Sequence, residues 1–139
     1  MEVIIETPKW SFVKYVHEGG RFRPALKSPL PTLFNYGYVK GVDGRDGMPQ
    51  DAIVLGARLP QGGEVEVRPV GVVRFTDCGL KDDKMVTSKD GRMAVTDMVK
   101  IHAFFTAYAL FKTVRCLLQE RRLAMCLYGG LKIFGRGME

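Results

Sequence analysis

The chain has 139 residues, and its 46% hydrophobic and 10% aromatic content is typical of a folded protein and excludes a disordered one. A chain of this length forms one domain with a sizeable core, so we expect a single domain over residues 1–139. The three cysteines, Cys78, Cys116 and Cys126, are odd in number and lack metal-type spacing, which argues against a disulfide framework and a zinc site.

The net charge of +6 comes from the C-terminal part of the chain. Up to Asp90, 13 Lys and Arg residues face 12 Asp and Glu residues, whereas beyond it 8 face 3. A solvated helix face explains this excess better than a nucleic-acid partner. Residues 1–6 contain acidic side chains where a signal peptide has basic ones. The apolar run at residues 103–111 is too short to span a bilayer. We therefore expect a cytoplasmic protein without membrane contact.

The first ninety residues predict short strands joined by Gly and Pro turns. Alternating or apolar runs indicate strands at residues 2–7, 12–16, 34–39, 52–55 and 65–73. A proline-rich crossing at residues 27–31 cannot lie inside a central strand. Many short strands joined in this way are typical of a small closed barrel, which we expect over about residues 1–90.

Two acidic turns lie at the ends of these predicted strands. In each turn two carboxylates stand five residues apart: Asp46 and Asp51 in the first, Asp77 and Asp82 in the second. Turns on the ends of paired strands can converge on one point, where four carboxylates would repel one another. A hard divalent cation such as Mg²⁺ relieves such repulsion, so the pattern predicts a metal site.

A helix is predicted to begin at Thr96 or Asp97 and to continue to at least Leu118, because no glycine or proline interrupts this stretch. Its apolar residues cover more than one face, so we expect the barrel to cover one side and a neighbouring subunit the other. A second apolar stretch at residues 123–128 ends at Gly129-Gly130, which gives a helical segment over about residues 96–128.

Six short motifs, in order, resemble those of family I soluble inorganic pyrophosphatases. They are Glu6 with Pro8, Lys14-Tyr15, Asn35-Tyr36-Gly37-Tyr38, Arg68 to Val72, the turn with Asp77, Asp82 and Lys84, and the group Phe104, Phe105 and Tyr108. The resemblance spans about residues 3–108. It implies a mainly β protein with α-helix, in which a five-stranded, OB-like closed barrel is flanked by C-terminal helices.

The same resemblance implies Mg²⁺-dependent hydrolysis of pyrophosphate to two phosphates in a homo-oligomer, a trimer or a hexamer. It gives the metal site Glu6, Asp46, Asp51, Asp77 and Asp82. It assigns phosphate binding to Lys14, Tyr36, Lys84 and either Arg21 or Arg23. It makes Asp51, Tyr36 and Lys84 catalytic as well. Positive side chains would neutralise phosphate oxygens, and metal ions would activate the attacking water.

The sequence departs from the family pattern at four positions that bear on chemistry. Met48 stands where the family has the carboxylate that activates water, and Val16, Thr32 and Ala109 replace a glutamate, a tyrosine and a lysine. Losing a general base costs about 10²- to 10⁴-fold in rate. The chain is therefore expected to be a slow pyrophosphatase. Two alternatives stay open: an impaired paralogue that binds metal or phosphate, and a basic OB-type domain that binds nucleic acid.

Overall fold

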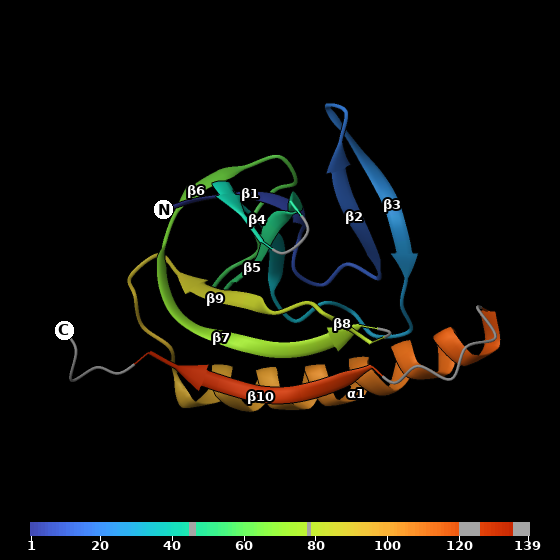
Figure 1. The fold of residues 1–139 in the computed structure, drawn as a ribbon. Helices are drawn as coiled ribbons and strands as arrows, with labels where there is room; N and C mark the ends of the chain where they lie inside the picture. The colour runs from blue at the N-terminus through green and yellow to red at the C-terminus, as the bar shows by residue number, and fades with distance from the viewer. Residues whose placement is uncertain (45–46, 78, 120–125, 135–139) are drawn as a thin grey trace.

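The computed structural model describes residues 1–44, 47–77, 79–119 and 126–134, and its strands build one large curved sheet and a separate hairpin (Figure 1). The strands of the large sheet are β1 (Glu2–Thr7), β4 (Asn35–Asp43), β5 (Pro49–Val54), β6 (Glu64–Glu66), β7 (Arg68–Asp77), β8 (Leu80–Lys81), β9 (Lys84–Ser88) and β10 (Leu127–Ile133). Their order is β10-β7-β9-β5-β4-β1-β6, with β8 paired to β7. Only the neighbours β5 and β9 are parallel.

The expected closed barrel is wrong for the part of the chain that the structure describes. The large sheet curls strongly, but β6 lies at one edge, β10 lies at the other, and these two strands do not pair. β10 comes from the C-terminal segment and pairs with β7 along Leu127–Ile133. The hydrogen-bonding groups on that edge of β7 are therefore already paired, and they are not available to close the sheet into a barrel. The coarser expectation of a mainly β fold with a C-terminal helix is confirmed.

A hairpin of β2 (Val13–Glu18) and β3 (Arg21–Lys27) projects from the sheet as a separate two-stranded unit (Figure 1). Gly19 and Gly20 form its turn with positive φ angles of 60° and 77°, which glycine adopts without strain. Pro24 lies in β3, where the hairpin has only one hydrogen-bonded neighbour and the missing N–H costs little. The hairpin is tied to β1 because the main-chain N–H of Tyr15 donates to Oγ1 of Thr7 at 2.9 Å.

Close contact between β1 and β4 explains the glycine in the Asn-Tyr-Gly-Tyr motif. A Cβ atom on Gly37 would collide with the main-chain carbonyl of Ile4. The Asn35 side chain accepts hydrogen bonds from the N–H groups of Lys9 and Leu59 and donates to the carbonyl of Ala57. Asn35 and Gly37 therefore hold β4 in place, which positions the two tyrosines of the motif.

One α-helix, α1 (Val95–Gln119), lies beside β10 and covers one side of the sheet (Figure 1). Asp97, in its first turn, reaches back and accepts a hydrogen bond at Oδ2 from the N–H of Ala94, the residue before the helix, at 3.0 Å. On its inner side Phe105 packs against Phe34 and Phe75, with ring centroids 6.4 and 5.8 Å away. The predicted extent of this helix is confirmed.

The predicted continuation of the helix to about residue 128 is wrong where the structure describes it. Residues 120–125 lie outside the described residues, and Leu127–Ile133 form strand β10. Gly129 and Gly130 lie inside this strand at a β-bulge, which tolerates the φ of 108° at Gly130. Gly71 lets the strand approach, since a Cβ there would lie 2.6 Å from the carbonyl oxygen of Lys132.

The outer side of α1 carries exposed apolar side chains: Val95, Val99, Leu110, Val114, Leu117 and Leu118. The expected subunit contact through this side stays a prediction. The helix is also long and apolar enough, by length and composition alone, to cross a membrane. The apolar run at residues 103–111 is short by itself, but the longer stretch of residues 101–118 contains only two Asp, Glu, Lys or Arg residues, Lys112 and Arg115. Its inner side nevertheless packs in the core, as the core helix of a folded domain does.

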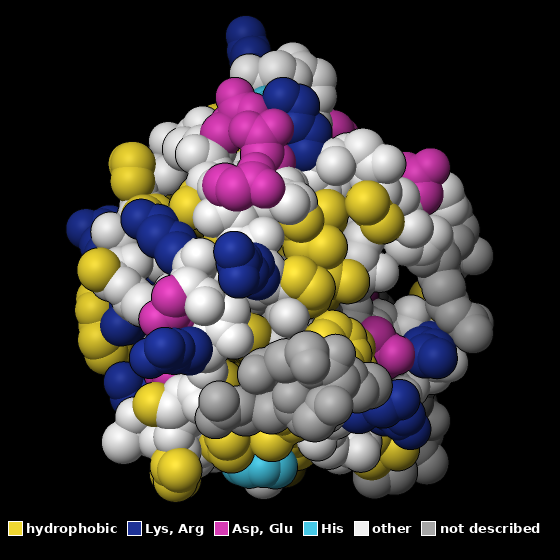
Figure 2. Space-filling model, turned by 90° about the vertical axis from the view of Figure 1, so that its left-hand side faces the viewer, with side chains coloured by type: hydrophobic (Ala, Val, Ile, Leu, Met, Phe, Trp, Pro, Cys, Tyr) yellow, Lys and Arg dark blue, Asp and Glu magenta, His cyan; other side chains and the backbone are white. Residues whose placement is uncertain are grey.

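The face turned toward the viewer in Figure 2 mixes Lys and Arg with acidic and hydrophobic side chains. The basic side chains on this face form separate groups and do not form one continuous stripe. A nucleic-acid backbone is bound by a continuous basic groove with interleaved aromatic rings. This face therefore lends no support to the nucleic-acid alternative.

Candidate functional site

An open cleft of about 940 Å³ lies between the large sheet and the β2–β3 hairpin. Seven of its lining side chains are acidic: Glu6, Glu18, Asp43, Asp51, Asp77, Asp82 and Asp83. The two predicted acidic turns therefore meet at one cleft, because β5 carries Asp51 and the loop before β9 carries Asp82. So many carboxylates in one cleft would repel one another without positive charge.

Lys84 supplies positive charge at the centre of this cluster. Its Nζ lies 2.8 Å from Oδ2 of Asp51 and 2.6 Å from Oδ2 of Asp82, and its side chain is only 3% exposed. Burial would lower the pKa of Lys84, but the two carboxylates outweigh it and raise the pKa. Burial would likewise raise the pKa of Asp51, but the Lys84 ammonium outweighs it and lowers the pKa. Lys84 and Asp51 are therefore held in their charged forms.

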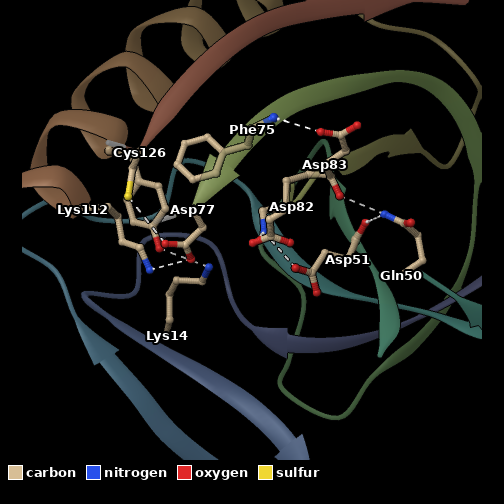
Figure 3. Close-up of polar contacts among 11 residues, drawn as sticks. Lys14, Gln50, Asp51, Phe75, Asp77, Asp82, Asp83, Lys112 and Cys126 are labelled. Atoms are coloured by element: carbon tan, nitrogen blue, oxygen red, sulfur yellow. Dashed lines mark hydrogen bonds and ion pairs between the residues drawn. The ribbon is translucent and has the colours of Figure 1, made fainter. Parts of the chain in front are cut away.

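Asp77 stands apart from this triad, beside Lys112 and Lys14 (Figure 3). Nζ of Lys112 lies 3.0 Å from Oδ2 of Asp77, and Sγ of Cys126 lies 3.6 Å from Oδ1. Burial would raise the pKa of Asp77, but the hydrogen bond and charge of Lys112 outweigh it and lower the pKa. The carboxylates of the cleft thus form two ion-paired groups, Asp51 and Asp82 around Lys84 and Asp77 beside Lys112.

Glu6 lines the cleft from β1, whereas Lys14 of the hairpin, like Tyr36 and Lys84, is not one of its lining residues. Oε2 of Glu6 accepts the N–H of His17 at 2.7 Å, and burial raises the pKa of this carboxyl. Nζ of Lys14 donates to Oη of Tyr108 at 3.3 Å and lies 4.6 Å from the centroid of the Tyr36 ring. Within the described part of the chain, Lys14 contacts two tyrosine rings and forms no ion pair with a carboxylate, which leaves its ammonium able to bind an anion.

Tyr36 carries a buried hydroxyl group that has no hydrogen-bond partner among the described residues. The side chain packs in the aromatic core against Phe104, and burial raises its pKa well above the ordinary value, so the phenol keeps its hydrogen. An unpaired buried hydroxyl costs about 1–3 kcal/mol. A hydroxyl kept at such a cost next to Lys14 is suited to donate to a bound anion.

We therefore predict that Tyr36→Phe leaves the free energy of unfolding unchanged or raises it by about 1 kcal/mol, because it removes the unpaired hydroxyl. Urea denaturation measures this effect. Tyr108→Phe is the matched control, since it removes a hydroxyl that does accept a hydrogen bond from Lys14. A larger loss of stability for Tyr36→Phe than for Tyr108→Phe would show that the Tyr36 hydroxyl is paired within the protein.

The other predicted site residues differ in position. Arg21 and Arg23 lie at the tip of the hairpin, and neither lines the cleft; Arg23 pairs instead with Glu18 at 3.1 Å. Asp46, a predicted metal ligand, and Cys78 lie outside the described residues. Val16 and Met48, which replace family carboxylates, both line the cleft.

Sequence reasoning missed two residues that hold the acidic turns. Nε2 of Gln50 donates to the carbonyls of Asp51 and Asp83 at 3.0 Å, which ties the two turns together. Lys112 lies four residues after Tyr108, so both project from one face of α1, and Lys112 reaches Asp77 from there. The i, i+4 spacing from Tyr108 was the available signal for Lys112.

The donor set of this cleft fits a hard divalent cation by its chemistry, since carboxylate oxygens are the ligands that Mg²⁺ prefers. Asp51 and Asp82 share one ammonium, so an ion close to Lys84 could reach both. In the described ranges, however, no three His, Cys, Asp or Glu side chains are grouped to hold one ion. The described carboxylates thus offer a pair of ligands rather than a complete cage.

Comparison with known sequences identifies inorganic pyrophosphatases as relatives of this chain. The sequence profile of the family described as inorganic pyrophosphatase matches residues 3–116. An inorganic pyrophosphatase of Streptomyces coelicolor is 35% identical over 123 residues, which cover 77% of this chain and 76% of that protein. That of Xanthomonas campestris is 36% identical over 115 residues, 78% of this chain and 58% of the relative. That of Sulfolobus acidocaldarius is 31% identical over 91 residues, 62% of this chain and 53% of the relative.

Comparison with solved structures agrees at the level of the fold. An inorganic pyrophosphatase from Neisseria gonorrhoeae superposes with a TM-score of 0.78 at 20% identity, covering 96% of this chain and 82% of the other. The enzyme from Thermus thermophilus gives a TM-score of 0.74 at 21% identity with the same coverage. The curled sheet with its C-terminal helix is therefore a fold that these proteins share.

Proposed function

Because the chain belongs to the inorganic pyrophosphatase family, family I, we propose that it hydrolyses inorganic pyrophosphate to two phosphate ions with Mg²⁺ as its cofactor. The chain spans between about half and three quarters of the length of the curated relatives cited above. Members of this family are hydrolases, and the residues of the acidic cleft are suited to the same chemistry.

One observation carries the proposal: Asp51 and Asp82 share the buried Lys84 ammonium in a cleft that also contains Glu6 and Asp77. Carboxylates gathered at this density are suited to hold divalent cations. Asp51 and Asp82 would bind Mg²⁺, together with Asp46 and with Asp77 and Glu6 nearby. The bound ion would neutralise phosphate oxygens and make water a better nucleophile.

The cations and the tyrosine would bind the substrate. Lys14 and Lys84 are point charges that would neutralise phosphoryl oxygens, and Tyr36 would donate its hydroxyl hydrogen to one of them. Lys84 would also keep Asp51 ionised, and its two ion pairs would hold Asp51 and Asp82 correctly spaced. Arg21 or Arg23 would bind phosphate if the hairpin tip moved toward the cleft.

A second candidate function is an impaired family member that binds metal and phosphate without efficient turnover. Met48 favours it, because this side chain is exposed on the cleft wall and a thioether cannot take a proton from water. Val16 also lines the cleft without the carboxylate of the family pattern. The two candidates differ only in whether phosphate is released.

Phosphate release from pyrophosphate, with and without Mg²⁺, tests the proposal. We predict Mg²⁺-dependent release and expect Asp82→Asn to lower it about 100-fold, because the variant removes a metal ligand and unbalances Lys84. Asp90→Asn is the matched control, since Asp90 is a solvent-exposed carboxylate outside the cleft. If the parent protein releases no phosphate with either Mg²⁺ or Mn²⁺ at several pH values, the second candidate function replaces the first.

A further inference from the structure

His17 and Tyr38 meet on the wall of the acidic cleft. Nδ1 of His17 lies 2.8 Å from Oη of Tyr38, and both side chains line the cleft. Phe22 lies opposite His17 across the hairpin and stacks on the imidazole, with centroids 4.5 Å and planes 16° apart. The N–H of His17 also donates to Oε2 of Glu6. His17 is therefore held through its ring face, through Nδ1 and through its main-chain N–H.

Counting hydrogens shows that this pair has one donor left over. A tyrosine hydroxyl and a neutral imidazole carry one hydrogen each, and their mutual bond uses one of the two. If Tyr38 donates to Nδ1, the remaining donor is Nε2–H of His17; if Nδ1–H donates, it is the hydroxyl of Tyr38. No described residue forms a hydrogen bond with Nε2 of His17. In either tautomer, one hydrogen stays available to a ligand.

Donors are scarce in this cleft, whereas acceptors are abundant. Lys81 pairs with Asp83, the Lys84 ammonium is shared between two carboxylates, and the Gln50 amide is used by two carbonyls. Besides the shared Lys84 ammonium, the Lys14 ammonium and the Tyr36 hydroxyl are the donors that the proposed function already assigns to phosphate. A phosphoryl oxygen that enters between seven carboxylates needs every available donor. We propose that His17, oriented by Tyr38 and Phe22, binds a phosphoryl oxygen of the substrate, with the His17–Tyr38 pair as the hydrogen-bond donor. This inference rests on the proposed function and adds a substrate-binding residue to the same cleft.

Imidazole ¹⁵N NMR tests the contact without turnover, because the chain holds only two histidines. His102 is an internal reference: its Nδ1 lies 2.6 Å from Oη of Tyr128, and neither residue lines the cleft. On addition of imidodiphosphate, a non-hydrolysable pyrophosphate analogue, with Mg²⁺, we expect the ring nitrogen signals of His17 to shift and those of His102 to stay. The variant His102→Gln assigns the two sets of signals.

Kinetics test the contribution of the pair to substrate binding. We expect His17→Ala to raise KM for pyrophosphate about tenfold with a smaller change in kcat, as for the loss of one hydrogen bond to a charged group. His17→Gln keeps a side-chain N–H and should recover part of the loss. Tyr38→Phe should raise KM similarly, and the double variant should be no worse than the single ones, because the pair acts as one unit. His102→Gln and Tyr128→Phe are matched controls and should leave KM unchanged.

Two results would overturn the inference: a KM for both His17 variants within twofold of the parent value, or His17 signals that do not move when imidodiphosphate binds. A fold defect in His17→Ala leaves His17→Gln and the NMR titration as tests. If the parent protein releases no phosphate, the proposed function fails, while the NMR titration still reports whether His17 contacts a bound diphosphate.

Discussion

Replacing Lys84 with methionine is expected to lower the free energy of unfolding by about 2 kcal/mol at pH 7 and to reduce phosphate release about 100-fold or more. The methionine fills a similar volume but leaves Asp51 and Asp82 facing each other without their shared ammonium. Breaking a fully buried ion pair costs about 3–5 kcal/mol, but both carboxylates are more than a third exposed, so water screens part of the loss.

The pH of the measurement follows from the direction of the Lys84 pKa shift. A lysine with a raised pKa in the folded state stabilises the protein fully below the ordinary pKa of 10.5 and loses this effect as pH rises through the folded value. Urea denaturation at pH 7 therefore records the whole contribution. Added Mg²⁺ should stabilise Lys84→Met more than the parent protein, because a cation bound by Asp51 and Asp82 would replace the missing charge.

Lys81→Met is the matched control for this experiment. Lys81 is exposed and lies 3.5 Å from Asp83 on the rim of the same cleft, so its loss should change stability by less than about 1 kcal/mol. If Lys84→Met unfolds at the same urea concentration as Lys81→Met, the buried ammonium does not hold the two carboxylates together. If only Lys84→Met loses activity while both are stable, the lysine acts on the substrate alone.

Local sequence patterns predicted the individual strands and the helix better than they predicted which strands pair with each other. The strand at residues 2–7 and the helix from about residue 96 were readable because alternation and the absence of Gly and Pro are local signals. The pairing of β10 with β7 could not be predicted in this way, because a Gly-Gly pair ordinarily ends a helix or a strand. Here Gly129 and Gly130 form a bulge within β10. That pairing depends on Gly71, almost sixty residues earlier in the chain, so no local pattern reveals it.

The same division holds at the candidate site. The five-residue spacing of the carboxylates, together with paired strands, predicted that the two acidic turns converge, and Asp51 and Asp82 do share one ammonium. The spacing did not predict that Lys112, a helix residue more than thirty positions after Asp77, would pair with Asp77 and hold it apart. The hydrogen bond between His17 and Tyr38 likewise joins two elements that only tertiary packing brings together.

The substitution Met48→Asp is expected to raise kcat for pyrophosphate hydrolysis at least tenfold. Met48 lines the cleft and is 63% exposed, so an aspartate there remains hydrated and should cost little stability. It would return a carboxylate to the position where the family pattern has the group that activates water. A general base contributes about 10²- to 10⁴-fold, and recovery of only part of this is expected because Val16 also departs from the pattern.

Met48→Asn separates proton transfer from a change of polarity, since it has the shape of aspartate but cannot act as a base. We expect Met48→Asp to exceed Met48→Asn in kcat and to show a new acidic limb in its pH–rate profile, below which the carboxylate is protonated and the gain is lost. Equal kcat values for the two variants, with no such limb, would mean that another step limits turnover. The rate would then depend on the groups around Lys84 and on binding by the hairpin residues, rather than on the base missing at position 48.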